Sequence, residues 1–230
     1  MKKTTILIAI LTTLFFSCTK DDDIDKKFDG SKSAIVDFLG ERAYDSIVKL
    51  GITFNTGNTP PDITGSYLVR PHILKKSLIP ADRNNIGTRF YDHTLVFKNI
   101  NLKELTIEYN GNYTSSLTDT SEGVYISGSD NKFTIVLKVT RVEKVKDEED
   151  MKSKSLFVIS GELDSDSKAI LNYHNALLML DNEGNSPPYI ENFQGRLVYD
   201  KDGVSEKITK KPSTKHSLES NNIGLFSVLP

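Results

Sequence analysis

Apolar and polar residues alternate along most of the chain after residue 60. Apolar side chains recur at every second position in short runs, which is the period of a strand with one buried face. The runs cover residues 63–69, 90–97, 105–109, 113–117, 124–127, 132–145, 156–163, 170–180, 195–199 and 204–209. About nine or ten short strands with hairpin-length connections predict a mainly β fold, an antiparallel meander that forms either a barrel or a β-sandwich.

Two short segments predict tight turns within this meander. Asn110 and Gly111 form a favoured hairpin dipeptide, so we expect the chain to reverse there. Residues 200–203, Asp-Lys-Asp-Gly, predict a second turn that makes a hairpin of 195–199 and 204–209. Residues 170–180 also fit an amphipathic helix, but their hairpin-like flanks favour a strand.

Residues 31–50 show helical spacing instead. Their apolar side chains form one stripe, made by Ile35, Leu39, Ala43, Ile47 and Leu50. The pattern predicts one N-terminal helix that packs on the sheet or plugs one end of a barrel. Gly40 leaves open a division into two short helices.

The first eighteen residues have the pattern of a secretory signal. Lys2 and Lys3 precede a mostly apolar run, 6–16, that is shorter than the roughly 20 residues a membrane-spanning helix needs. The run leads into Ser17 and Cys18, the only cysteine of the chain. This arrangement resembles a bacterial lipobox, which implies cleavage before Cys18 and acylation of its thiol.

The residues after Cys18 resemble a sorting signal. Lys20, Asp21, Asp22 and Asp23 are similar to the export signal of Bacteroidetes lipoproteins, which implies display on the outer face of the outer membrane. The expected organisation is therefore a signal peptide at 1–17, an acylated cysteine with an acidic tether at 18–30, and a single β-rich domain with an N-terminal helix at 31–230.

The order of elements also resembles lipocalin-like lipoproteins. A short helix and a proline-containing loop at 55–62 precede Gly65-Ser66-Tyr67, which opens the first strand. Lipocalins carry Gly-x-Trp at this point, and Tyr67 takes the place of the tryptophan here. The resemblance implies a β-barrel whose interior binds a ligand.

Charge and motifs exclude several functions. The formal net charge of −2 argues against a nucleic-acid partner. The four histidines, His72, His93, His174 and His216, lack the spacing of a metal-binding or zinc-protease motif. There is no nucleophile elbow and no phosphate loop, and the acidic clusters lack EF-hand spacing. We therefore expect a protein that is not an enzyme and that needs no metal or cofactor.

Two functions remain. The first is a non-enzymatic surface lipoprotein that binds a small or extended ligand in a barrel, with Tyr67, Tyr91, Tyr109 and His174 as candidate contacts. His174 is a candidate because Tyr173 and Asn175 make its segment unusually polar. The second is a structural or interaction lipoprotein, an accessory of an outer-membrane complex with no pocket. With either function, the protein would be attached to the membrane through its lipid anchor. The sequence does not identify its small-molecule or protein partner.

Overall fold

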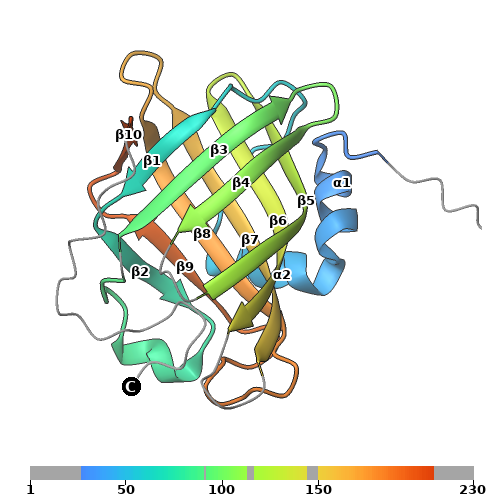
Figure 1. The fold of residues 1–230 in the computed structure, drawn as a ribbon, viewed down its shortest axis with the longest axis vertical. Helices are drawn as coiled ribbons and strands as arrows, with labels where there is room; N and C mark the ends of the chain where they lie inside the picture. Colours follow the sequence, from blue (N-terminus) through green and yellow to red (C-terminus); the bar gives the residue numbers. More distant parts are fainter. Residues whose placement is uncertain (1–26, 91, 113–116, 144–149, 210–230) are drawn as a thin grey trace, which may run out of the picture.

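Strands make up most of the part of the chain that the structure describes (Figure 1). The computed structural model describes residues 27–90, 92–112, 117–143 and 150–209. Two helices, α1 (Lys32–Leu39) and α2 (Glu41–Leu50), precede the strands, and a 3-10 helix, η1 (Pro80–Asn84), follows the second strand. The strands are β1 (Gly65–Val69), β2 (His72–Ser77), β3 (His93–Asn101), β4 (Thr106–Asn112), β5 (Leu117–Ser129), β6 (Lys132–Glu143), β7 (Met151–Leu163), β8 (Ile170–Asp181), β9 (Gly195–Asp200) and β10 (Val204–Ile208).

These strands form one antiparallel sheet that closes on itself. From β3 to β8 each strand pairs with the next one along the chain, as in a meander. β1 pairs with both β3 and β10, and β10 also pairs with β8, so the hydrogen-bonded neighbours form a ring. The predicted mainly β, antiparallel meander is confirmed. Its closure into a barrel-like ring leaves no free edge at the β1 end of the sheet.

The last two strands do not form the predicted hairpin. β9 and β10 both run antiparallel to β8, with Tyr199 opposite His174 and Val204 opposite Leu171. The chain therefore keeps its direction through residues 201–203, which act as a bulge in one long bent strand. β1 and β2 form a second bent strand that pairs with it, β1 with β10 and β2 with β9. Residues typical of turns bend the sheet here instead of reversing the chain.

The predicted turn at Asn110-Gly111 is also wrong. Both residues lie within β4, where Asn110 faces Val96 and Gly111 faces Leu95 of β3. Gly111 has a packing role, because a Cβ at this position would overlap the Tyr109 hydroxyl. The predicted strand at 113–117 falls largely outside the described residues.

The N-terminal helical segment is divided at Gly40, the alternative that the sequence left open. Gly40 has φ +81°, which ends α1 and begins α2. Ser31 Oγ caps α1 by accepting a hydrogen bond from the backbone N–H of Ala34 at 3.2 Å. The predicted stripe is buried on both helices. Figure 1 shows the helices beside the ring and not across its end.

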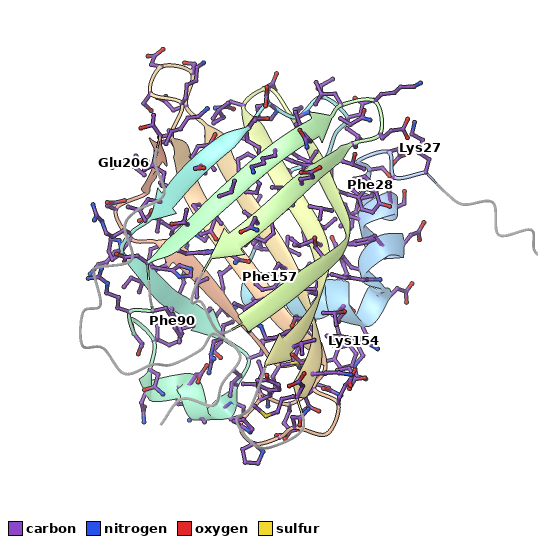
Figure 2. The ribbon with its side chains drawn as sticks, in the orientation of Figure 1. Lys27, Phe28, Phe90, Lys154, Phe157 and Glu206 are labelled. Carbon is purple, nitrogen blue, oxygen red and sulfur yellow. The ribbon has the colours of Figure 1, made fainter. Side chains whose placement is uncertain are left out.

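Two apolar cores result, one inside the ring and one under the helices. Alternate residues of the same strands contribute to each core. Interior residues include Leu137, Phe157, Leu177 and Val198, and their outward neighbours under the helices include Val136, Leu156, Leu178 and Leu197. Figure 2 labels Phe157, an interior side chain. Burial on both faces explains why 170–180 resembled a helix, and the predicted strand there is confirmed as β8.

Candidate functional site

The structure separates the four predicted contact residues. Tyr67 and Tyr109 point into the ring, with the Phe97 ring between them, 6.1 Å from Tyr67 and 5.7 Å from Tyr109 between centroids. His174 lies on the outside of β8, so the expectation that it shares an interior space with the tyrosines fails. Tyr91 falls outside the described residues, as do Cys18 and Lys20, Asp21, Asp22 and Asp23.

Tyr67 uses its hydroxyl within the fold. The side chain is fully buried, and its Oη donates a hydrogen bond to the Ile63 carbonyl at 3.0 Å. Burial, helped by the Asp62 charge, raises the pKa of Tyr67 to about 12. Lys207 Nζ lies 5.8 Å over the ring. These contacts join the loop before β1 to β10, so Tyr67 stabilises the ring closure.

A group of polar side chains occupies the ring interior beyond Phe97. We call it the interior polar cluster: it consists of His72 of β2, His93 of β3, Tyr109 of β4, Tyr173 and Asn175 of β8, and Asp200 of β9. Five strands contribute, and no two of these side chains are adjacent in sequence. The closed ring of strands brings them together because the inward-facing positions of all its strands share one interior.

The distances within the interior polar cluster are short. The rings of His72 and His93 lie 5.6 Å apart, and those of His72 and Tyr173 lie 6.4 Å apart, between centroids. Tyr109 Oη lies 3.5 Å from His93 Nε2. His72 and Asp200 are opposite each other in the β2–β9 register. The cluster therefore spans the interior from the β4 side to the β9 side.

Burial keeps two members of the cluster uncharged. It lowers the pKa of His93 well below the ordinary value, and the neighbouring His72 contributes to this effect. Burial likewise raises the pKa of Tyr173 well above the ordinary value, with a further contribution from Tyr109. At neutral pH the cluster thus presents a neutral imidazole and a neutral phenol.

Asp200 joins the two bent strands. One carboxylate oxygen, Oδ2, accepts hydrogen bonds from Ser205 Oγ at 2.8 Å and from the Arg70 backbone N–H at 3.2 Å. Burial is the main cause that raises the pKa of Asp200 to about 6. The side chain therefore changes its charge within the range of mildly acidic environments.

Several hydrogen-bonding atoms of the cluster lack partners among the described residues. They are Tyr173 Oη, both amide atoms of Asn175, and Asp200 Oδ1. Asn175 lies near enough to Tyr173 to oppose the rise in the pKa of the phenol, yet the two side chains make no hydrogen bond of normal geometry. Buried polar groups in proteins are almost always paired, so this group is unusual.

Among the described residues, β4 and β5 share the fewest paired positions of any two neighbouring strands in the ring. In the part of the chain that the structure describes, these two strands share a single register pair, Thr106 with Tyr125, whereas β5 and β6 pair along their whole length (Figure 1). Tyr109 lies on β4 beyond that pair. Its side chain points inward yet is only half-buried. Tyr109 thus brings one member of the interior polar cluster to this seam.

His174 belongs to a small surface group. Its ring stacks on Tyr199, with centroids 6.0 Å apart, and its Nε2 lies 2.6 Å from Lys75 Nζ. An ammonium can only donate, so Nε2 accepts and Nδ1–H donates to the Asn172 carbonyl at 2.9 Å. Partial burial, together with the Lys75 charge, lowers the pKa of His174. The imidazole is therefore neutral at pH 7 and is fully engaged in surface contacts.

The sequence pointed to the segment of β8 that carries Tyr173 and Asn175, but it selected the outward-facing His174. Tyr173 and Asn175 face the interior because Leu177 and Met179, at the same parity, belong to the interior core. Residues 176–178 are all apolar, so the sequence does not indicate which of them face the interior and which face outward. No sequence pattern marked His72 and Asp200 as interior residues, because each lies beside a bend in the chain.

No metal-binding arrangement stands out in the residues that the structure describes, since none of their His, Asp and Glu side chains gather in groups of three or more that could hold an ion. Within the same residues, no helix has the length and apolar character required to cross a membrane. No family model matches this chain, no curated protein matches its sequence, and no solved structure matches its fold.

Proposed function

We propose that this protein is a non-enzymatic lipoprotein of the outer-membrane surface that binds a small or extended ligand inside its barrel. The anchor part of the proposal rests on the apolar run that ends at Cys18 and on the residues after it, Lys20, Asp21, Asp22 and Asp23. The binding part rests on the interior polar cluster, which is the observation that carries it.

The cluster supports binding because of its hydrogen-bonding capacity. An unpaired buried donor or acceptor costs about 1–3 kcal/mol, and Tyr173 and Asn175 together hold three such atoms. A ligand with both donors and acceptors would restore these hydrogen bonds and regain that free energy. Water bridges would do the same without a ligand, so the experiment must separate the two cases.

The position of the cluster also favours binding. The seam between β4 and β5 lies beside Tyr109. This tyrosine is the most exposed of the six residues of the interior polar cluster. An extended ligand could enter sideways there, whereas the opposite wall, β6 to β8, is paired throughout and covered by the helices. The same seam would place the outer part of an extended ligand against β4.

Native mass spectrometry of the acylated protein, released from detergent, tests the binding part. The wild type should carry a co-purified non-covalent mass. The variant Tyr173→Phe/Asn175→Leu removes the unpaired atoms with little change in volume and should lose it. His174→Gln, on the same strand but outside the ring, is the matched control and should keep it.

Two outcomes would contradict the binding part. A wild type that carries no additional mass would favour an accessory lipoprotein whose cluster is bridged by water. An additional mass that persists in Tyr173→Phe/Asn175→Leu would place the ligand elsewhere on the protein.

A further inference from the structure

A hollow of about 460 Å³ lies on the outside of the protein, at the start of α1. Its lining comes from residues 27–38 and from Tyr125 of β5. Figure 2 labels Lys27 and Phe28, which mark the entry of the chain beside α1. The volume falls within the roughly 300–1,000 Å³ typical of small-molecule sites. The hollow is separate from the interior polar cluster, which lies on the other face of the sheet.

Aromatic rings line the floor of the hollow. Phe28 stacks on Tyr125 with centroids 4.6 Å apart, and Phe38 meets Tyr125 edge-on at 5.1 Å. Phe28 is buried, whereas Phe38 and Tyr125 keep part of their surface exposed. Lys138 Nζ lies 4.8 Å from the Phe38 ring and holds it in place from the sheet side. The floor thus offers partly exposed aromatic surface to a ligand.

Hydroxyl and carboxylate oxygens line the rim. Ser31 and Ser33 lie 2.9 Å apart between their Oγ atoms. Asp29 and Asp37 add carboxylates, and Asp29 also accepts a hydrogen bond from the Ser31 backbone N–H at 2.9 Å. The hydrogen bonds with Ser31 lower the pKa of Asp29, so this carboxylate stays ionised at neutral pH.

The ionised groups of the lining disfavour anionic ligands. Lys27 is the one basic side chain among the lining residues, and it pairs with Glu104 at 3.1 Å. The ionised Asp29 carboxylate disfavours phosphate, sulfate and carboxylate groups at this side of the hollow. Several acceptor oxygens above an aromatic floor suit a neutral molecule with hydroxyl groups and one apolar face. A sugar ring has this combination.

We propose that this hollow is a saccharide-binding site, in which Tyr125 and Phe38 contact the C–H face of a sugar ring and Asp37 and Ser33 accept or donate hydrogen bonds to its hydroxyls. The site is open on one side, so it accommodates the end of a longer chain as well as a single ring. Because the proposal does not depend on the barrel interior, either site can exist without the other.

Saturation-transfer NMR on the acylated protein in detergent micelles tests this site. The probes are methyl glucoside, methyl galactoside and methyl N-acetylglucosaminide, with choline and inorganic phosphate as charged comparisons. At least one glycoside should receive saturation at its ring C–H protons. Failure of all three, or a signal from choline or phosphate instead, would overturn the proposal.

Two pairs of surface variants locate the binding. Ser33→Trp fills the hollow and should weaken binding about tenfold or more, whereas Lys32→Trp, its exposed neighbour outside the lining, should leave it unchanged. Asp37→Asn should also weaken binding, whereas Asp45→Asn on exposed α2 surface should not. Equal affinity of Ser33→Trp and Lys32→Trp would place the saccharide elsewhere and overturn the assignment.

Discussion

Asp200 is the titrating residue with the clearest consequence for stability. Its carboxylate holds β1, β2 and β10 together through Arg70 and Ser205, yet burial raises its pKa from 3.8 to about 6. The folded protein therefore binds a proton between about pH 4 and pH 6 that the unfolded chain releases. The free energy of unfolding should fall as pH rises through this window, and the loss is complete above about pH 6.

Asp200→Asn should remove this pH dependence. Two pKa units correspond to about 3 kcal/mol, which is the upper limit of the expected effect. The asparagine can still accept hydrogen bonds from Arg70 and Ser205. Urea denaturation at pH 4 and pH 7 should therefore show the variant more stable than wild type at pH 7 only. An equal difference at both pH values would contradict the assignment.

Cys18 carries the second prediction at the residue scale. Two or three acyl chains on this residue would give a firm anchor, because each buried methylene contributes about 0.8 kcal/mol. Metabolic labelling with a palmitate analogue should mark the wild type and leave Cys18→Ala unmarked. Equal labelling of the two proteins would show that the lipid is attached elsewhere.

At the scale of elements, β6 shows how one strand serves two cores. Phe133, Ile135 and Leu137 face the ring interior, and Val136 faces the helices. Burying such a side chain contributes about 1.5–3 kcal/mol, so the alternation fixes the register of β6 against β5 and β7. A one-residue slip would place each side chain in the wrong core.

Leu137→Asp should therefore prevent stable folding. The substitution places a charge, with no partner in the surrounding apolar core, at a fully buried position, and we expect a loss of about 4 kcal/mol or more. Lys152→Asp, at an exposed position of β7, is the control and should change stability by less than about 0.5 kcal/mol. Circular dichroism and thermal unfolding measure both. A folded Leu137→Asp protein would contradict the two-core arrangement.

On the scale of the whole molecule, the folded domain begins at an earlier residue than the sequence predicted. Phe28 is 93% buried in the outer core, with an exposed fraction of 7%, and the Gly30 carbonyl accepts a hydrogen bond from Gly57 N–H at 2.9 Å. Residues 28–30, assigned to the tether by their polarity, belong to the folded body. A tether from Cys18 to Lys27 would then reach at most about 33 Å from the membrane.

Surface display should depend on the residues next to the anchor. Replacing Lys20, Asp21, Asp22 and Asp23 with alanine should reduce access to external protease or antibody without loss of acylation. Asp25→Ala/Lys26→Ala changes the same tether outside those four positions and is the control. Unchanged access in the fourfold variant would assign the sorting information elsewhere.

Local sequence determined the elements of this protein. Period-two alternation located most of the strands, and the period of the apolar stripe at 35–50 located the helical segment, because both signals depend only on neighbouring residues. Gly40 marked the helix break for the same reason. Tyr67 and Tyr109, two of the candidate contacts named from the sequence, do lie in the interior.

Tertiary structure alone decided which strands close the ring and which side chains meet inside it. The local sequence of residues 200–203 predicts a hairpin turn. They form a bulge instead because β9 and β10 both pair with β8. In a strand that is buried on both faces, the sequence does not indicate which alternate residues face the interior. The pattern therefore could not place His174 outside and Tyr173 inside. The interior polar cluster joins residues as far apart as His72 and Asp200 because strand pairing is non-local, and no local pattern encodes it.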